Sequence, residues 1–364
     1  MNRTSHGSIR VVRCGSMALV QDQGRFGFQE LGVSVSGAAD KEALDVGNIL
    51  VGNSSDLAAL EIMLGEFEIV FVQSTIFALT GAETDARLDD VSVGRHLSYK
   101  AHAGSRLSLS NVRQGLRAYI SVQGGIDTPI VLGSRSTHIA SAIGGFEGRG
   151  LQPGDVLAVG KSEPGSGFAS RCWDGEIEFA ADDLTVRVVL GPQDDEFSES
   201  GIKTFLSSTY VVSDQSNRQG LRLQGSAIES RNGRYDIVSD AVVNGSIQVP
   251  GDGNPIILLA DRQTTGGYIK IATVASVDIP KLGQACPGSQ ISFSAVSVEE
   301  SQQFFIERQK KLSTSIIEPV GDQVFLRVDD TDISVGMVVS GSAQIAVLDG
   351  IAYPIVVDQI IPDE

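Results

Sequence analysis

Cysteine, histidine and tryptophan are scarce in this 364-residue sequence, which contains three, four and one of them respectively. Cys14, Cys172 and Cys286 are odd in number and far apart, so they form neither a CxxC pair nor a disulfide framework. The histidines show no metal-ligand spacing, so no metal is expected. This cysteine content favours a reducing, cytoplasmic environment.

Long apolar runs are also missing. No stretch reaches the length that crosses a bilayer, and residues 1–13 lack the apolar centre of a signal peptide. Lys and Arg number 28 against 45 Asp and Glu, which gives a net charge of -17. Because an acidic surface repels phosphate backbones, we expect neither nucleic acid nor a membrane as a partner.

Several familiar functional motifs are absent as well. The sequence has no GxSxG elbow to anchor a serine-hydrolase triad. Gly-Lys-Ser at residues 160–162 lacks the first glycine of a phosphate-binding loop, because Asp155 stands in its place. No lysine has a Met-Lys-Met context, so we expect no biotin attached to this chain.

Glycine, in contrast, is abundant, with 41 residues spread along the chain. Runs of β-branched and apolar residues recur between glycine-containing turns. This pattern predicts a mainly β protein with sandwich or barrel sheets rather than repeating βαβ units. The expected strands cover residues 17–21, 68–72, 76–80, 118–123, 186–190, 210–212, 255–260 and 271–277.

Few helices are expected, and they are short. Asp40 is placed to cap a helix over residues 41–51, which Gly52 would end. Residues 195–206 form a weaker candidate.

A third helix is expected near the end of the second half. Ser297 and Glu300 form a capping box, in which each side chain satisfies a free amide, and it opens a helix over residues 298–312. Phe305 and Leu312 are expected to face the protein from this helix.

The chain contains a faint internal duplication, with four landmarks in the same order in both halves. They are QDQGRFG (21–27) and QSNRQG (215–220), YISVQGG (119–125) and SIQVPGDG (246–253), PIVLGSRST (129–137) and PIILLADRQTT (255–265), and a Pro-Gly turn into a strand (153–157 and 287–291). We therefore expect two related lobes, each with a strand that ends in an Arg-x-Thr turn.

Composition divides the chain into parts. Ser, Gly, Pro and acidic residues cluster around the middle, which predicts a linker there. The expected parts are a tail (1–11), an N-terminal β lobe (12–160), the linker (161–181), a C-terminal β lobe with a terminal helix (182–312) and an atypical strand-like extension (313–364).

The segment that follows the expected strand at residues 255–260 is the stronger candidate for chemistry. Arg262 offers a planar guanidinium that binds carboxylates and phosphates. Three side chains after it can donate to an oxyanion or an amide oxygen, namely Gln263, Thr264 and Thr265. Gly266 and Gly267 allow a ligand to approach the backbone. An equally weighted alternative is that Asp261 pairs with Arg262, the threonines cap a turn and the glycines form a hairpin.

A second candidate lies in the first lobe, over residues 21–40. Ser36 and Gly37 come just before the helix cap, so free amides at the helix start can hold an anion there. The alternative, which local evidence favours, is that Ser36 and Asp40 only cap the helix.

Seven stretches occur in a familiar order: QDQGRFG, GVSVSGAAD, GN…AALE, LTGAE, GGID…LGSRST, GGFEGRGLQPGD and LLADRQTTGGY…KIATV. On these stretches, over residues 12–312, the chain resembles the biotin-dependent carboxyltransferase-like family. That family includes the C subunit of bacterial 5-oxoprolinase, proteins labelled allophanate hydrolase subunit 2, and the carboxyltransferase region of urea carboxylase.

The resemblance implies two cyclophilin-like β-barrel lobes and a role in a complex. In 5-oxoprolinase, the A, B and C subunits together use ATP to cleave 5-oxoproline to glutamate. The resemblance thus implies a carboxyltransferase-like subunit with A-like and B-like partners, ATP used by the complex, and a small lactam or amide substrate. Two alternatives stay open. One is carboxyl transfer from carboxybiotin on a separate carrier to urea or a related amide. The other is non-catalytic, regulatory binding to a kinase-inhibitor protein.

The resemblance also organises the candidate residues. The proposed catalytic residues are Arg218, Arg262, Gln263, Thr264 and Thr265, with the two arginines as cations for phosphate and carboxylate. The proposed substrate-binding residues are Gln21, Arg25, Ser36, Gly37, Gln215, Gly266, Gly267 and Tyr268. The chain departs from the family pattern beside these residues, with Ala39 where Met is usual and Asn217 where Asp is usual. These departures leave the exact substrate open.

Overall fold

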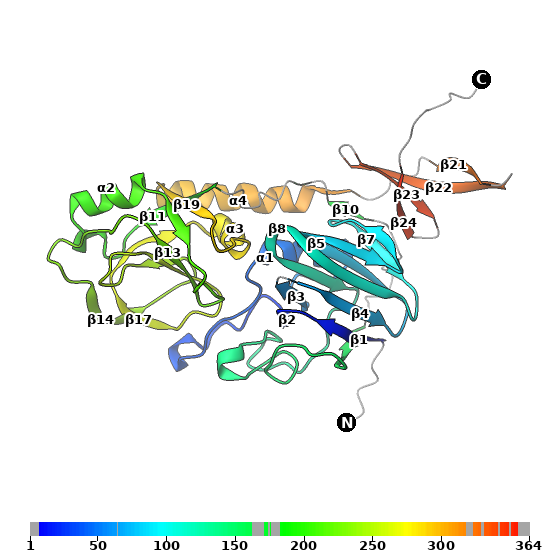
Figure 1. The fold of residues 1–364 in the computed structure, drawn as a ribbon, viewed down its shortest axis with the longest axis horizontal. Helices are drawn as coiled ribbons and strands as arrows, with labels where there is room; N and C mark the ends of the chain where they lie inside the picture. The colour runs from blue at the N-terminus through cyan, green and yellow to red at the C-terminus, as the bar shows by residue number, and fades with distance from the viewer. Residues whose placement is uncertain are drawn as a thin grey trace, which may run out of the picture.

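The computed structural model describes residues 7–63, 65–161, 171–173, 175, 183–317, 323–328, 331–340, 343–348 and 351–355. Two β lobes lie side by side, and the helix α4 (Val298–Thr314) runs alongside both of them (Figure 1). The expected mainly β class, with few helices, is confirmed. No helix in the described part of the chain is long and apolar enough to cross a membrane.

The first lobe is a curled, nine-stranded sheet (Figure 1). Its strands are β1 (Gly7–Cys14), β2 (Met17–Gln21), β3 (Ala59–Met63), β4 (Phe67–Phe71), β5 (Thr75–Leu88), β6 (Val91–Val93), β7 (Ser98–Ala101), β8 (Arg106–Val122) and β9 (Val156–Val159). Six follow the order β2-β3-β8-β4-β1-β9, and β5 pairs with β6, β7 and β8. Long β8 therefore joins both parts of the sheet.

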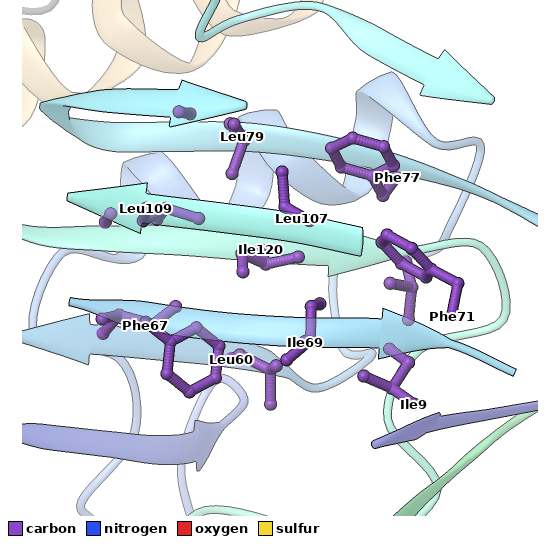
Figure 2. Close-up of a cluster of buried hydrophobic side chains, with 14 of the residues drawn as sticks. Ile9, Leu60, Phe67, Ile69, Phe71, Phe77, Leu79, Leu107, Leu109 and Ile120 are labelled. Carbon is purple, nitrogen blue, oxygen red and sulfur yellow. The ribbon is translucent and has the colours of Figure 1, made fainter. Parts of the chain in front are cut away.

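Alternation along these strands places one set of side chains in a common core. Figure 2 shows apolar side chains from several strands, among them Phe67, Phe77 and Ile120, gathered between the strands. Phe71 stacks on Phe77 with ring centroids 5.2 Å apart. This core fixes the position of each strand, including β2, which ends at the candidate site residue Gln21.

The second lobe is a closed barrel in the order β11-β18-β15-β16-β13-β12-β19. These strands are β11 (Asp183–Leu190), β12 (Tyr210–Val212), β13 (Gly220–Gln224), β15 (Ser246–Gln248), β16 (Ile256–Leu258), β18 (Lys270–Val274) and β19 (Gln290–Ala295). Phe205 stacks on Phe293 in the hydrophobic core of this lobe, with ring centroids 4.4 Å apart. A separate antiparallel pair, β14 (Asp236–Ala241) and β17 (Thr265–Tyr268), lies outside the barrel order.

The two helices with predicted caps begin where those caps indicate, whereas the weaker candidate, expected over residues 195–206, begins four residues later. The Asp40 carboxylate accepts a hydrogen bond from the Ala43 amide at 2.9 Å and opens α1 (Lys41–Leu50). The weaker candidate is α2 (Glu199–Ser207), which Ser198 caps. The remaining short helices are α3 (Ile279–Gly283) and the 3-10 turns η1 (Gln29–Leu31), η2 (Ile139–Ser141), η3 (Asp194–Glu196) and η4 (Ser276–Asp278).

Helix α4 has the expected capping box but presents a different face from the one expected. Leu312 is buried as predicted, whereas Phe305 is 46% exposed, so its predicted orientation was wrong. Phe304 turns inward instead and lies 4.4 Å from the Arg187 guanidinium. Phe304, Arg308 and Leu312 are spaced by four residues and share one face, while Phe305 is rotated by about 100° from it.

The segment expected as a linker lies mostly outside the described residues. Within it, β10 (Cys172–Trp173) pairs with β20 (Ile316–Ile317), and Trp173 is buried against α1. Residues 324–328 and 344–348 lie in strands, as expected. They belong to a four-stranded antiparallel sheet of β21 (Gln323–Val328), β22 (Thr331–Ser340), β23 (Ala343–Leu348) and β24 (Ile351–Ile355).

The two copies of the duplicated Arg-x-Thr segment differ in structure. The second copy begins in β16, as expected. The first copy, residues 129–137, forms turns closed by a bridge between Val131 and Ser134, so the strand expected there was wrong. The Asp22 carboxylate binds the hydroxyls of Ser134 and Ser136. The Ser136 amide also donates to the Ser134 hydroxyl at 2.9 Å, and local side-chain bonds of this kind compete with strand formation.

Candidate functional site

Loops from both lobes meet at the lobe boundary. The segment before α1 inserts against the end of β16, because the Ser36 amide donates to the Ala260 carbonyl at 3.0 Å. The Ser36 hydroxyl donates to Asp261 Oδ1 at 2.8 Å. The Gly37 carbonyl accepts from Arg218 Nη2 at 2.5 Å. Candidate site residues that were predicted separately in the two lobes, such as Ser36 and Gly37 in the first and Arg218 in the second, thus lie together.

Arg218 is the centre of this boundary. Its Nε donates to Asp261 Oδ2 at 2.8 Å, and its Nη2 donates to Asp261 Oδ1 at 3.1 Å. Its Nη1 donates to Glu61 Oε1, which belongs to β3 of the first lobe. All three side chains are buried. The Arg218 charge is therefore matched by two carboxylates and ties the lobes together.

The carboxylate of Glu61 extends the network into the first lobe. Its Oε2 accepts from Tyr119 at 2.7 Å and from the Ala39 amide at 3.0 Å, and Arg117 Nε lies 3.6 Å from Oε1. Burial, together with the nearby Glu61 and Asp40 charges, raises the pKa of Tyr119 well above its usual range. Tyr119 therefore remains a neutral hydrogen-bond donor.

Gln284 makes a second link between the lobes. Its Oε1 accepts from the amides of Leu116 and Arg117, both at 2.9 Å, and its Nε2 donates to Asp40 Oδ2 at 2.7 Å. Burial raises the pKa of Asp40 to about 6, although the hydrogen bonds from Gln284 and the Ala43 amide oppose the rise. The α1 cap is thus connected to the second lobe.

The first-lobe residues Gln21 and Arg25 both bind backbone carbonyls of the first Arg-x-Thr segment. Gln21 Nε2 donates to the Thr137 carbonyl at 3.0 Å, and Arg25 Nη2 donates to the Ser136 carbonyl at 2.5 Å. Arg25 is fully buried, and its Nε and Nη1 have no hydrogen-bond partner in the described part of the chain. Burial lowers the pKa of Arg25, with Asp22 and Asp261 acting in the opposite direction.

The segment before α1 uses its own amides within the protein, while the anion site expected at the helix start stays a prediction. Ser36, Ala38, Ala39 and Asp40 all donate their amides within the protein. Asp40 does cap the helix, whereas the Ser36 hydroxyl binds Asp261 and Thr137 instead. Gly37 has φ +93°, and a Cβ there would lie 2.9 Å from the Gln23 carbonyl oxygen. These residues therefore support the boundary.

Arg262 differs sharply from Arg218. It is only 6% exposed, yet its nearest bond is a long one from Nη1 to the Leu259 carbonyl, at 3.5 Å. Its Nε has no hydrogen-bond partner among the described residues. Asp261 pairs with Arg218, so the alternative Asp261–Arg262 pair is not formed. Burial alone lowers the pKa of Arg262 to about 10.

A turn at Ala260 and Asp261 follows β16, and the Arg262 amide closes it by donating to the Leu259 carbonyl at 3.1 Å, so the expected strand that ends in a turn is confirmed for this copy. Thr265–Tyr268 is strand β17, which pairs with β14, so the alternative hairpin over the two glycines is not formed. Gln263, Thr265 and Tyr268 are exposed, and Thr264 is partly exposed. A Cβ at Gly266 would lie 2.3 Å from Gln248 Nε2, at the end of that side chain. The polar side chains that come after the buried Arg262 in the sequence therefore lie at the surface.

A cavity of about 390 Å³ opens onto the ion network. Arg117, Arg218 and Asp261 line it together with apolar side chains such as Met17 and Met63. Gln215 is exposed and precedes Ser216, another lining residue. Polar groups in a largely apolar hollow are typical of small-molecule sites. The described residues contain no cluster of three side chains suited to a metal.

Comparison with known proteins places this architecture in a family. The carboxyltransferase domain, subdomains A and B, matches residues 31–295. The chain belongs to this family. It is 41% identical to the 5-oxoprolinase C subunit of Escherichia coli over 297 residues, which are 80% of this chain and 93% of that protein. Identity to the 5-oxoprolinase C subunit of Haemophilus influenzae is 36%, over 86% of this chain and 99% of that protein.

More distant relatives in the family are longer proteins. Urea amidolyase of Saccharomyces cerevisiae is 32% identical over 81% of this chain, which corresponds to 17% of its own length. The crystal structure of K. lactis urea amidolyase superposes with a TM-score of 0.77 at 27% identity, over 96% of this chain and 23% of that one. This chain therefore spans less than a quarter of either urea amidolyase.

Several residues of this family member's site were missed from the sequence. They are Glu61, Arg117, Tyr119, Asp261 and Gln284. A charged residue inside an apolar strand was the available signal for Glu61, which stands between Leu60 and Ile62. No local signal marks Gln284, because the four hydrogen bonds of its side chain all reach residues at least 167 positions away.

Proposed function

We propose that this chain is the carboxyltransferase-like subunit of an ATP-dependent 5-oxoprolinase that cleaves 5-oxo-L-proline to L-glutamate. The observation that carries the proposal is 41% identity across 93% of a 5-oxoprolinase C subunit. Partner subunits resembling 5-oxoprolinase A and B complete the enzyme, and ATP is used by the complex. We place this hydrolase in the cytoplasm.

The chemistry of lactam opening fits the boundary between the lobes. In our proposal, ATP transfers its terminal phosphoryl group to the lactam oxygen, and water then attacks the activated carbonyl carbon. The C–N bond breaks to give the acyl phosphate of the glutamate side chain, and a second water hydrolyses this acyl phosphate, so that glutamate, ADP and phosphate result. Such a reaction needs a cation for the substrate anion and donors for the developing oxyanion. The cavity and the adjacent arginines supply groups of these kinds.

We assign the two arginines different roles. Arg262 binds an anion, because no carboxylate matches its buried charge in the described part of the chain. Arg218 positions the site, because Glu61 and Asp261 already bind it. The proposed donors are Gln263, Thr264 and Thr265. The proposed surroundings of the substrate are Gln21, Arg25, Ser36, Gly37, Gln215, Gly266, Gly267 and Tyr268.

The test is to reconstitute the chain with A-like and B-like subunits and to measure ATP-dependent glutamate release. Arg262→Met should lower turnover by about 100-fold, which is the usual effect of removing one preorganised charge or donor. Arg222→Met is the matched control, because Arg222 is exposed on β13. Unchanged turnover in Arg262→Met would remove Arg262 from the mechanism, and no glutamate from the wild-type assembly would refute the proposed function.

A second candidate function is carboxyl transfer from carboxybiotin to urea or a related amide. The similarity to urea amidolyase favours it. This activity would need a separate biotin carrier. Supplying a carboxylated carrier and urea distinguishes the two functions, because only the second candidate consumes the carboxyl group without 5-oxoproline.

A further inference from the structure

One histidine of the cavity at the lobe boundary has no role in the function proposed above. His138 follows the first Arg-x-Thr segment, and its side chain lines the cavity of about 390 Å³. It is only 7% exposed, yet its imidazole makes no hydrogen bond to any described residue. A buried polar side chain normally has such a partner. The imidazole nitrogens are therefore available to a ligand in the cavity.

The main chain holds this imidazole in a fixed position. The His138 amide donates to the Ile143 carbonyl at 2.9 Å, and the Ile143 amide donates back at 3.3 Å. The preceding residue, Thr137, donates its amide to a carbonyl of β2 at 3.0 Å. Its own carbonyl lies 2.9 Å from Ser36 Oγ, which also donates to Asp261 Oδ1 at 2.8 Å. The backbone of His138 is thus tied to the ion network through one hydroxyl group.

The cavity joins His138 to the charged groups of that network. Arg117, Arg218 and Asp261 line the same cavity. Arg117 is 1% exposed, and its Nε has no hydrogen-bond partner among the described residues, although it lies 3.6 Å from Glu61 Oε1. The cavity therefore combines a buried imidazole with a buried guanidinium donor, and both have hydrogen-bonding capacity left for a ligand.

The other two histidines in the described part of the chain cannot take this place. His96 lies edge-on to Trp173, with ring centroids 5.1 Å apart, and burial lowers the pKa of His96 to about 3, so this ring stays neutral. His102 is exposed between β7 and β8. Neither of them lines the cavity. Imidazole is the side chain best suited to accept and release a proton near neutral pH.

We propose that His138 is a catalytic proton carrier for opening of the lactam ring, first as a base toward the attacking water and then as an acid toward the ring nitrogen. This step rests on the proposed function. In the phosphorylated ring, the former carbonyl carbon is double-bonded to nitrogen, because the lactam proton has been lost. The water oxygen forms a new C–O bond and becomes the carbonyl oxygen of the acyl phosphate. The electron pair of the broken C–N bond stays on nitrogen, and both water protons pass through His138 to that nitrogen, which becomes the amine.

The test compares two products of the complex reconstituted with A-like and B-like subunits. The wild type should release one ADP for each glutamate. His138→Gln keeps a polar side chain that cannot carry a proton, so glutamate release should fall by about 100-fold, as is usual for loss of a general acid–base group. ADP release should fall less, because phosphorylated lactam that fails to open returns its phosphate to water. The ratio of ADP to glutamate should therefore rise several-fold.

Two companion variants complete this experiment. His138→Ala leaves space in the cavity, so added imidazole should restore part of the glutamate release. His102→Gln, at an exposed position, is the matched control and should keep both the rate and the ratio of the wild type. An equal fall of ADP and glutamate in His138→Gln, or no fall at all, would overturn the role of His138 while the proposed function stands. No glutamate from the wild-type assembly would instead refute the proposed function, and this step with it.

A measurement without catalysis guards against a variant that fails to fold. Diethyl pyrocarbonate labels accessible imidazoles, and mass spectrometry of the wild-type full chain gives the labelling rates of His138 and of the exposed control His102. We expect 5-oxoproline at millimolar concentration to slow labelling of His138 several-fold and to leave His102 unchanged. Equal labelling of His138 with and without 5-oxoproline would show that the ligand does not reach it and would overturn the inference.

Discussion

Two buried arginines at the lobe boundary should respond to the same substitution with opposite changes in stability. Arg262 is 6% exposed and has no carboxylate partner in the described structure. Burial lowers its pKa to about 10, a shift that corresponds to roughly 3 kcal/mol of desolvation cost in the folded state. Arg262→Met removes the charge and keeps a long apolar stem. We expect the free energy of unfolding to rise by about 1–3 kcal/mol, the remainder being lost packing.

Arg218 presents the opposite case. Arg218→Met leaves the buried Asp261 carboxylate without its cation and Glu61 with Arg117 alone, and the Gly37 carbonyl loses its donor. Removing one partner of a buried ion pair typically costs about 3–5 kcal/mol. That loss is a large fraction of the stability of an ordinary domain, about 5–15 kcal/mol. The triple variant Arg218→Met, Glu61→Gln, Asp261→Asn should recover part of it, because neither carboxylate then carries a charge, although Arg117 loses its Glu61 partner.

Urea unfolding, followed by circular dichroism and by the fluorescence of Trp173, gives the free energies. Arg222→Met is the control for removing an exposed arginine and should stay within about 0.5 kcal/mol of the wild type. The reasoning fails if Arg262→Met and Arg218→Met destabilise the protein equally. It also fails if the triple variant is no more stable than Arg218→Met alone.

Two further predictions concern the cap of α1 and the glycine turns. Burial raises the pKa of Asp40 to about 6, so the folded state favours the protonated form of this side chain. The free energy of unfolding of the wild type, compared with that of Asp40→Asn, should therefore fall by up to about 3 kcal/mol as the pH rises from about 4 to about 6. Urea titrations across this range check the slope, and parallel curves for the two proteins would contradict it. Gly145→Ala should lower the free energy of unfolding by about 3–4 kcal/mol, because φ is +55° there and the new Cβ would lie 1.9 Å from Thr137 Oγ1. At Gly27, where φ is +89°, a Cβ meets no atom within 4 Å, so Gly27→Ala should cost only the backbone strain of about 1–2 kcal/mol. Thermal unfolding of the two glycine variants compares them, and equal losses would show that the contact with Thr137 is unimportant.

Local sequence signals predicted the regular elements well. The strand expected over residues 17–21 is β2, and the one over 210–212 is β12. The capping box at Ser297 and Glu300 opens α4 as predicted. These signals succeed because a cap or an alternating run depends on residues within one or two turns of the chain.

Predictions failed where a distant partner decided the conformation. The first copy of the Arg-x-Thr segment has the composition of a strand, but Asp22, more than 100 residues away, binds its serine hydroxyls and holds it in turns. Phe305 and Phe304 are equally apolar, but in the folded protein Phe304 packs against the Arg187 guanidinium while Phe305 is 46% exposed.

The sequence by itself determined the mainly β class, the helix caps and the presence of arginines next to polar donors in both lobes. It could not determine which arginine carries an unmatched charge. That depends on the docking of the lobes, which brings Glu61 to Arg218 across 157 residues and leaves Arg262 without a carboxylate in the described structure. The physical reason is that charge pairing in a buried boundary depends on separations of a few ångströms between segments far apart in the chain, and only tertiary packing sets those separations.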